Sequence, residues 1–440
     1  MKKFTCGLLT AIVSMIFPFL TTAQQWNALD DQLNTEVYDL CVYNGELYAG
    51  GSFTYSAGNP CPNRLARYDG EQWHPIGADN IDGNILSVCV YNDKLYIGGE
   101  FSYVDGQYSR YIACWDGSAW EPLDWQLDWF VHEMFVYDGE LYFTGPTYAG
   151  PVYLSELGKY DGENVTAASD DWFYDNIYAM EEMNGHLWAG GRFTQVGSLM
   201  TGRLAYWDGI SWAVPQEGVD NIVYALGADK TNDILYIGGY FTMAGSVEAS
   251  LIAGYDFTTQ NYFALEGGVS GNMFSSVKAL LSFNDKLFVG GEFWEVNNQP
   301  QSNFAIWDGQ EWEETETNIG IINKFCVFQD EIYAGGYISG GVMRWGESSG
   351  LIENNITALP LTVFPNPANK NISIDLDKYP TVKFSSVTLI NLVGEKIINQ
   401  TENLEGKLNI DISSLPVGIY VITAQDNAGA KYIKKITVMH

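Results

Sequence analysis

Few residues in this sequence have the types and spacing that catalysis or metal binding requires. The four histidines, His74, His132, His186 and His440, occupy unrelated positions, and the sequence contains no zinc-protease, serine-nucleophile or phosphate-loop motif. Its many carboxylates include no closely spaced, alternating set of the kind that binds Ca²⁺. We therefore expect no catalytic residue, no metal site and no cofactor.

Two segments combine aromatic and acidic residues, DWQLDW at 124–129 and DDWFY at 170–174. Aromatic rings can stack on sugar rings while carboxylates accept hydrogen bonds from hydroxyls, so these segments are candidates for a glycan site. The expected ligand-facing residues are Trp125, Asp128, Trp129, Asp171, Trp172 and Tyr174. Two alternatives stay open: packing of the same rings between structural repeats, and glycoside cleavage by paired carboxylates, which depends on their separation.

The composition excludes several classes of partner. The 440 residues include 54 Asp and Glu against 22 Lys and Arg, and the formal net charge is -32. Such a charge repels phosphate backbones and anionic lipid headgroups, which argues against binding to nucleic acid. Aromatic residues make up 15% of the chain, enough apolar surface to build a folded core.

A Gly-Gly pair or its equivalent recurs seven times and shows that the chain is built from repeats. The pairs begin at Gly50, Gly98, Thr144, Gly190, Gly238, Gly290 and Gly335. Each ends an apolar segment, as in LYAGGSF and LFVGGEF, and follows another apolar segment across an Asn-Gly, Asp-Gly or similar turn. Such turns supply the positive φ angles of two-residue hairpins, so the two segments are expected to pair as antiparallel strands.

A second hairpin follows in each repeat, with an aromatic-Asp-Gly turn and a tryptophan such as Trp73 or Trp120. Each repeat therefore supplies four short strands. Sheets of this size bury both faces when they are arranged around an axis, which is the β-propeller architecture. No repeat shows the 3.6-residue period of a helical solenoid.

The two ends of the array predict how the ring closes. The seventh repeat stops near Trp345 without a tryptophan-bearing fourth strand, while residues 25–29 (QWNAL) match the fourth strand of the first repeat at 72–76. We expect residues 25–29 to complete the last blade, which would remove its exposed edge. The predicted fold is all-β: a seven-bladed β-propeller closed by an N-terminal strand. Cys41, Cys89 and Cys326 share one repeat position and are expected to be small core residues.

The first 23 residues have the features of a signal peptide. Lys2 and Lys3 precede an uncharged segment at 4–23, and the small residues before Gln24 predict cleavage between Ala23 and Gln24. A retained membrane anchor is the alternative. No later segment is apolar for the roughly 18 residues that a membrane span needs, so the mature form is expected to lack one.

The last 80 residues differ in character from the rest. Residues 24–360 contain 47 acidic and 12 basic residues, whereas residues 361–440 contain 7 acidic and 8 basic ones. Alternating segments such as ISIDL and LNIDI predict a small antiparallel β-sandwich. The expected organisation is a signal peptide at 1–23, a propeller at 24–349, a linker at 350–360 and a C-terminal domain at 361–440.

Both parts resemble known families. The order of Gly-Gly, aromatic-Asp-Gly and Trp resembles kelch-type propeller repeats over about residues 25–346, with departures at Thr144, Val165 and Asp256-Phe257. The C-terminal domain resembles the type A sorting domain of the type IX secretion system in Bacteroidetes-type bacteria. The residues that carry this resemblance are Pro365, Asn366, Pro367, Gly394, Leu415, Pro416, Gly418, Tyr420, Lys434 and Lys435.

These resemblances imply a destination more firmly than an activity. The expected partners are signal peptidase and the type IX translocon, and the expected location is the outer cell surface or the medium. The expected function is non-enzymatic binding or surface presentation, with a glycan or a surface protein as ligand. The alternative is an extracellular carbohydrate-active enzyme that uses the loop face of the propeller.

Overall fold

The computed structural model describes residues 24–347 and 359–438, with short gaps in each range. The gaps are 30–31, 57–58, 61–63, 77–80, 124, 126, 146–147, 150–151, 154–155, 314, 316–318, 362, 365–367, 377–378, 380–381, 392–395, 402–403, 405, 417 and 427–430. The predicted signal peptide therefore lies outside the described residues. The chain divides into two compact units between Ser348 and Ser349.

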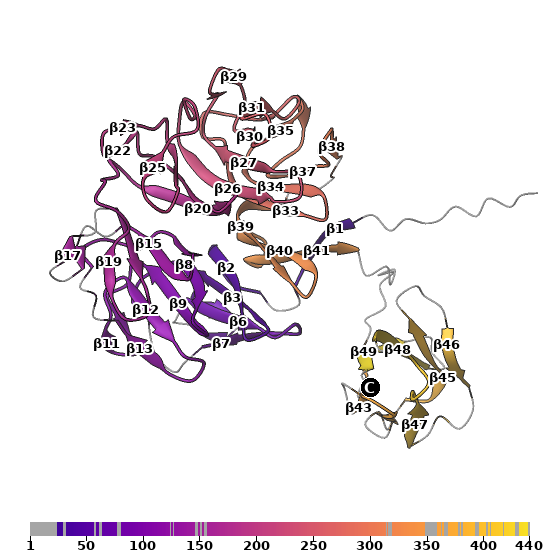
Figure 1. Ribbon diagram of the computed structural model, residues 1–440. Helices are drawn as coiled ribbons and strands as arrows, with labels where there is room; N and C mark the ends of the chain where they lie inside the picture. Colours follow the sequence, from indigo (N-terminus) through magenta and orange to yellow (C-terminus); the bar gives the residue numbers. More distant parts are fainter. Residues whose placement is uncertain are drawn as a thin grey trace, which may run out of the picture. The chain divides into compact units, whose positions relative to one another are not determined.

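The first unit is a ring of seven four-stranded antiparallel sheets, as expected for a propeller (Figure 1). Blade one contains β2 (Val37–Tyr43), β3 (Glu46–Gly51), β6 (Leu65–Tyr68) and β7 (Trp73–Pro75). Blade two contains β8 (Ile85–Tyr91), β9 (Lys94–Gly99), β12 (Ile112–Trp115) and β13 (Trp120–Pro122). Blade three contains β14 (Met134–Tyr137), β15 (Glu140–Thr144), β18 (Leu157–Tyr160) and β19 (Val165–Ala167). Blade four contains β20 (Ile177–Met183), β21 (His186–Gly191), β24 (Leu204–Trp207) and β25 (Trp212–Ala213). Blade five contains β26 (Val223–Asp229), β27 (Ile234–Gly239), β30 (Ile252–Asp256) and β31 (Asn261–Ala264). Blade six contains β33 (Ser276–Phe283), β34 (Lys286–Glu292), β37 (Phe304–Trp307) and β38 (Trp312–Glu313). Blade seven is β39 (Gly320–Phe328), β40 (Glu331–Ile338), β41 (Val342–Glu347) and β1 (Gln24–Ala28). The first strand of every blade contacts the first strand of the next, and β39 contacts β2, so the ring is complete.

The N-terminal strand β1 closes this ring, as the sequence predicts. It pairs antiparallel with β41, with Trp26 opposite Trp345 and Ala28 opposite Met343. The Trp26 ring is 6% exposed and packs against Phe304 of blade six and Phe325 of blade seven, with ring centroids 5.0 and 6.2 Å apart. The strand starts at Gln24, the residue that follows the predicted cleavage site.

Two close approaches explain the repeated Gly-Gly pair. A Cβ on Gly50 would lie 2.6 Å from Cγ2 of Ile85 in the next blade, so the first glycine lets neighbouring blades approach. A Cβ on Gly51 would lie 2.2 Å from the carbonyl oxygen of Glu36 in its own blade. Both distances are shorter than a non-bonded contact to a carbon atom, so a larger residue at either position would force the strands apart.

The repeated Asp-Gly turns are held by the aspartate side chains. Asp69 Oδ1 accepts hydrogen bonds from the backbone N–H groups of Glu71 and Gln72 at 2.8 and 2.9 Å. Equivalent bonds form at Asp116, Asp161, Asp208 and Asp308. These aspartates therefore form turns, as the sequence indicates.

The departures from the repeat pattern leave the architecture intact. Thr144, which replaces a glycine, accepts a hydrogen bond from the backbone N–H of Glu133 at 3.0 Å. Val165, which replaces a tryptophan, lies in β19 and completes its blade. Asp256, which is followed by phenylalanine, accepts the same type of backbone hydrogen bond, from Thr258 N at 2.7 Å.

Short hairpins and the connections between blades share one side of the ring, which we call the loop face. The hairpin strands are β4 (Tyr55–Ser56), β5 (Asn59–Pro60), β10 (Tyr103–Val104), β11 (Gln107–Tyr108), β16 (Tyr148–Ala149), β17 (Val152–Tyr153), β22 (Gln195–Val196), β23 (Leu199–Met200), β28 (Met243–Ala244), β29 (Val247–Glu248), β35 (Glu295–Val296) and β36 (Gln299–Pro300). A connection pairs with the hairpin of the blade that it enters, as Phe173 does with Val196 and as β32 (Val269–Ser270) does with β35. The Asn-Gly and Asp-Gly turns lie on the opposite side, which we call the turn face.

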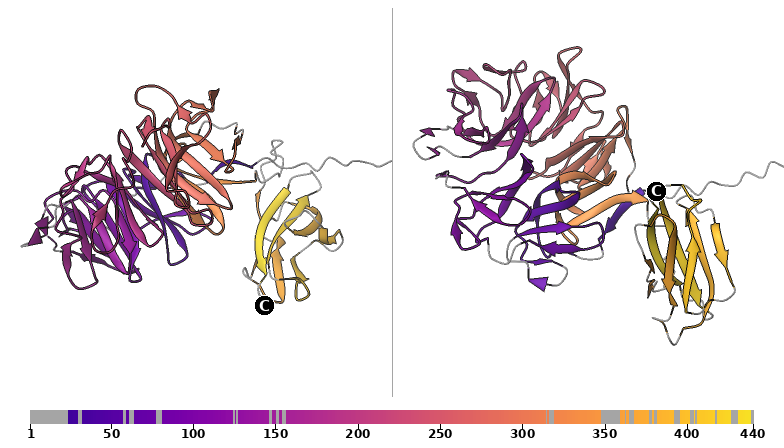
Figure 2. Two further views of the ribbon diagram at one scale, coloured as in Figure 1. Left: turned by 45° about the horizontal axis from the view of Figure 1, so that its top comes forward. Right: turned by 60° about the horizontal axis from the view of Figure 1, so that its bottom comes forward.

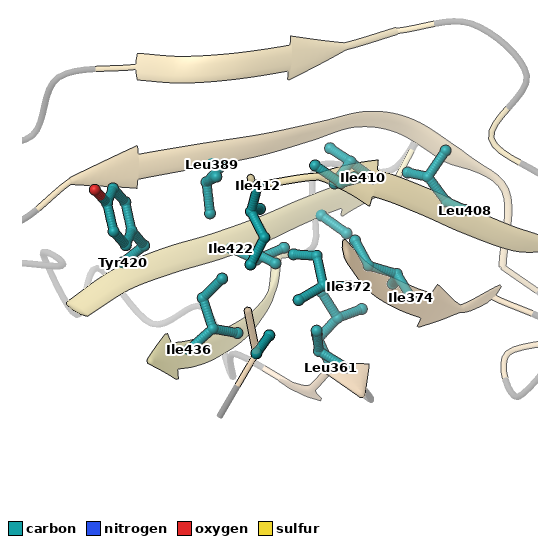
Figure 3. Close-up of a cluster of buried hydrophobic side chains, with 14 of the residues drawn as sticks. Leu361, Ile372, Ile374, Leu389, Leu408, Ile410, Ile412, Tyr420, Ile422 and Ile436 are labelled. Carbon is teal, nitrogen blue, oxygen red and sulfur yellow. The ribbon is translucent and has the colours of Figure 1, made fainter. Parts of the chain in front are cut away.

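The second unit is a sandwich of two sheets (Figure 2). One sheet contains β42 (Leu359–Pro360), β49 (Lys431–Val438), β48 (Gly418–Asp426), β45 (Phe384–Asn391) and β46 (Lys396–Gln400), and the other contains β43 (Val363–Phe364), β44 (Asn371–Asp375) and β47 (Lys407–Asp411). Side chains such as Ile372, Leu389 and Ile422 fill the space between them (Figure 3). One detail differs from expectation: β42 pairs parallel to β49 and uses the last two residues of the segment predicted as linker.

Candidate functional site

Large exposed apolar side chains are concentrated on the loop face. Sixteen such residues are exposed in the described part of the chain, and twelve lie on this face or at the strand ends that border it. The twelve are Tyr103, Tyr108, Trp129, Trp172, Tyr174, Leu199, Met200, Tyr240, Met273, Phe274, Trp294 and Tyr337. Exposed apolar surface that gathers on one side of a soluble protein is typical of a binding surface.

The aromatic residues predicted to face a ligand fall into two groups. Trp129, Trp172 and Tyr174 are 52%, 46% and 55% exposed on the loop face. Trp125 is half-buried, and its ring centroid lies 4.8 Å from that of Tyr160, so this tryptophan packs within blade three. Trp125 thus fits the packing interpretation, while contact with a ligand stays a prediction for the three exposed residues.

Backbone hydrogen bonds fix the connection that carries Trp172 and Tyr174. Gly197 N donates to Trp172 O at 2.8 Å, and Tyr174 N donates to Gln195 O at 3.1 Å. Both bonds join the connection to the hairpin of blade four. The intervening Phe173 is buried, so the alternation of a strand directs its two exposed neighbours to the surface.

The predicted acidic residues Asp128 and Asp171 also lie on the loop face. Asp128 is exposed, and Asp171 is half-buried against Gly197, where a Cβ would lie 2.2 Å from Asp171 Oδ1. Asp128 belongs to an acidic group between blades three and four, whose other members are Glu156 and Asp175. Burial raises the pKa of Glu156 to about 7, and the charges of Asp175 and Asp128 add to this rise. Arg192 Nε lies 3.3 Å from Asp175 Oδ2 and balances part of the charge.

The raised pKa of Glu156 predicts a pH dependence of stability. The folded protein holds a proton on this carboxyl that the unfolded chain, with a pKa near 4.5, releases. Its contribution to stability is therefore full below about pH 4.5 and is lost as the pH rises through about 7. We expect the Tm of Glu156→Gln, relative to wild type, to increase between pH 5 and pH 8 in thermal unfolding. Glu163→Gln, an exposed change in the same blade, is the control, and an equal shift in both variants would contradict the assignment.

Sequence inspection missed the exposed apolar residues of the other blades. Met273 and Phe274 are 73% and 68% exposed in the connection to blade six. Tyr103 and Tyr108 face each other across the hairpin of blade two, with ring centroids 5.6 Å apart. Their position in the repeat could have identified them, because all four lie in segments that the repeat pattern assigns to the loop face.

The central channel contains a charged group that the sequence analysis also missed. Asp39, Glu133 and Lys324 occupy the same repeat position at the innermost strands of blades one, three and seven. Lys324 Nζ lies 3.2 Å from Asp39 Oδ1 and 3.6 Å from Glu133 Oε1. The lysine therefore links three blades, including the first and the last of the ring.

Asp39 is held firmly in this group. Its side chain is almost fully buried and accepts hydrogen bonds from Ser87 Oγ at 3.2 Å and from Val88 N at 2.8 Å, both in blade two. Of the Lys324 side chain, 37% is accessible, because it lines a cavity of about 390 Å³ inside the channel. The ion pair is thus enclosed by protein, while its lysine reaches water within the channel.

The charges in the channel do not balance. Burial opposes ionisation of Lys324, yet the carboxylates of Asp39 and Glu133 raise its pKa above the usual value. Burial raises the pKa of Glu133, and Asp39 raises it further, while Lys324 acts in the opposite direction. Burial also raises the pKa of Glu181, a third carboxyl in the channel lining. Three carboxyl groups and two lysines, Lys324 and Lys278, therefore line this cavity, which leaves the carboxyl groups in excess.

The described residues contain neither a metal-binding cluster nor a membrane-spanning helix. No group of three or more His, Cys, Asp or Glu side chains is arranged to hold a metal ion there. In the same part of the chain, no helix has the length and apolar character needed to cross a membrane. Cys41, Cys89 and Cys326 are free thiols on the innermost strands, and burial raises the pKa of each.

The residues of the predicted sorting motifs lie in two places. Tyr420 Oη donates to Pro416 O at 3.0 Å, which ties Leu415, Pro416 and Gly418 to the start of β48. Lys434 and Lys435 lie in β49 opposite Ile422 and Val421. Pro365, Asn366, Pro367 and Gly394 lie outside the described residues.

Comparison with known proteins identifies the second unit. Residues 362–439 match the family model of the secretion system C-terminal sorting domain. This domain directs type IX secretion, so the protein is exported to the cell surface or the extracellular space. No curated protein matches the chain.

Two of the solved structures that match this chain are extracellular domains from B. thetaiotaomicron. One is the extracellular domain of a protein described as a one-component system, with 12% identity and a TM-score of 0.46; the match covers 95% of this chain and 59% of the other. Another is the extracellular domain of a protein described as a hybrid two-component system, with 10% identity and a TM-score of 0.44, covering 92% and 55%. The chain spans less than two thirds of the length of either protein.

Proposed function

We propose that the propeller is a non-enzymatic binding module whose loop face binds a glycan or a surface protein after export. The observation that carries this proposal is the location of the exposed apolar side chains, twelve of sixteen of which lie on or beside the loop face. Aromatic rings such as Trp129 and Trp172 offer flat apolar surfaces to sugar rings. Neighbouring carboxylates, among them Asp128 and Asp175, can accept hydrogen bonds from sugar hydroxyls.

The test is binding of the mature protein to a glycan array and to extracted surface polysaccharide. The double substitution Trp129→Ala and Trp172→Ala is expected to weaken binding at least about 30-fold, which is the effect of losing one aromatic hot spot of about 2 kcal/mol. Ile210→Ala is the control, because Ile210 is 86% exposed on the turn face. Binding that survives the double substitution, or that is lost in the control, would rule out the loop face as the site.

A second candidate function is extracellular carbohydrate cleavage. Glu156 supports it, because burial, with Asp175 and Asp128 adding to the effect, raises its pKa to about 7, in the range of a general acid. Incubation with a panel of polysaccharides should then release reducing ends, and Glu156→Gln should abolish the release. Release that persists in the variant, or none in the wild type, would eliminate this candidate.

We propose that the C-terminal unit directs export of the propeller through the type IX secretion system. A chain that ends at Ser348 keeps all seven blades and lacks the sorting domain. In a host with type IX secretion we expect this truncated protein to accumulate in the periplasm, while the full chain reaches the surface or the medium. Cell fractionation and immunoblotting measure the difference, and normal secretion of the truncated protein would show that another signal directs export.

A further inference from the structure

The central channel has free space because three consecutive blades carry alanine where the others carry larger polar side chains. Blades one, two, three and seven place Asp39, Ser87, Glu133 and Lys324 at this level of the channel. Blades four, five and six place Ala179, Ala225 and Ala279 there, and all three alanines line the cavity. Its volume of about 390 Å³ is in the range of small-molecule sites.

Aromatic side chains line the cavity one residue nearer to the loop face. Tyr178 and Tyr224 stack with ring centroids 5.5 Å apart and planes 29° apart. His132 meets the Tyr178 ring edge to face at 6.3 Å, and Tyr38 lines the same cavity. A tyrosine ring attracts a cation that lies over its face, so these rings can contribute to the binding of a positively charged group.

The buried charges favour the same sign. Lys324, Ser87 and Val88 all contact the carboxylate of Asp39. Lys324 Nζ lies farther from Glu133 Oε1, at 3.6 Å, than from Asp39 Oδ1, at 3.2 Å. Glu181 accepts a hydrogen bond from the backbone N–H of Glu182 and lines the cavity. Burial raises its pKa, and the charges of Lys230, which pairs with Glu182, and of Lys324 oppose this rise only in part. Lys278, the other lysine in the lining, lies 3.9 Å from Glu292 outside the cavity. A second positive charge would therefore complete the group.

From this geometry we propose that the central channel binds a small molecule that carries an ammonium group. The ammonium contacts Glu133 and Glu181, and the remainder of the ligand occupies the space beside Ala179, Ala225 and Ala279 under the tyrosine rings. The site is distinct from the exposed aromatics of the loop face, and its occupant is the size of an amino acid or an amino sugar.

Proton release accompanies binding in this proposal. Burial and Asp39 raise the pKa of Glu133, with Glu181 contributing and Lys324 opposing, so part of the protein holds a proton there near neutral pH. Burial lowers the pKa of His132, which therefore stays neutral in this range. A cation beside Glu133 favours its ionised form and displaces the proton.

Isothermal titration calorimetry of the mature full-length protein tests the proposal with two matched pairs of probes. n-Propylammonium is compared with n-propanol, and D-glucosamine with D-glucose, at up to about 50 mM, because ligands of so few atoms bind weakly. We expect saturable binding at one site for at least one ammonium probe and none for its neutral partner. The heat is expected to differ between phosphate and MOPS buffers at pH 7.5, because a proton is released and neither buffer is a primary ammonium that would compete with the probe.

Variants locate the site. Glu133→Gln should weaken ammonium binding about 10-fold or more, as expected when a charged hydrogen-bond partner is lost. Ala225→Leu should fill the cavity and weaken binding similarly, whereas Ile210→Ala, at a position 86% exposed on the turn face, should leave it unchanged. Circular dichroism verifies that each variant is folded. Equal binding of the neutral probes, undiminished binding in both channel variants, or no saturable binding of either ammonium probe would overturn the proposal.

Discussion

Replacing Trp26 by alanine is expected to lower the free energy of unfolding of the propeller by about 3–5 kcal/mol, the usual cost of removing a buried aromatic side chain. The ring lies between Phe304, Phe325 and Trp345 and is 6% exposed. Its loss removes contacts that hold β1 in the last blade. The effect extends beyond one cavity, because β1 supplies the outer strand of the last blade from the N-terminal end of the propeller.

Guanidinium unfolding followed by tryptophan fluorescence measures this change. All 14 tryptophans precede residue 346, so the signal reports the propeller and not the C-terminal unit. Trp129→Ala makes the same substitution at a 52% exposed position and should change stability by no more than about 0.5 kcal/mol. Equal effects of the two substitutions would mean that β1 adds little to the closed ring.

Replacing Lys324 by methionine is expected to destabilise the propeller by about 3 kcal/mol. The substitution leaves Asp39 and Glu133 without their shared cation. Removing one partner of a buried ion pair costs about 3–5 kcal/mol, and the lower end applies because the channel cavity admits water around the lysine. Chemical unfolding at pH 8, where more carboxylates are ionised, should show the largest effect.

Two further variants separate this ion pair from a general loss of charge. Lys278→Met changes another inner-strand lysine, whose pair with Glu292 is long at 3.9 Å and partly exposed, and should cost less than about 1 kcal/mol. Asp39→Asn added to Lys324→Met should recover part of the lost stability, because it removes a buried charge that no longer has a partner. A double variant less stable than Lys324→Met would contradict the ionic link.

The repeat pattern predicted the propeller because close packing imposes strict local requirements. Gly50 and Gly51 each face an atom that leaves no room for a Cβ, so the pair must recur wherever blades meet. Asp69 and its equivalents recur because their carboxylates hold the backbone of a turn. The match of 25–29 to the outer strand of blade one predicted closure, and the observed strand is shifted by one residue, to Gln24–Ala28.

The candidate sites were predicted less completely because they depend on contacts between repeats. Trp125 and Trp129 are four residues apart in one connection, yet only the second is exposed, since the first meets Phe143 and Tyr160. The channel group joins residues as distant in sequence as Asp39 and Lys324. Aligning the repeats would have placed these two residues at the same level of the ring, but their contact follows only once the ring is closed.

Backbone hydrogen exchange of β1 tests the closed ring most directly, because both the channel and the loop face depend on it. We expect the amides of Trp26–Ala28 that pair with β41 to exchange as slowly as those of β40, in mass-spectrometric exchange on the mature protein. Rapid exchange throughout Trp26–Ala28, with β40 still protected, would contradict the closed ring.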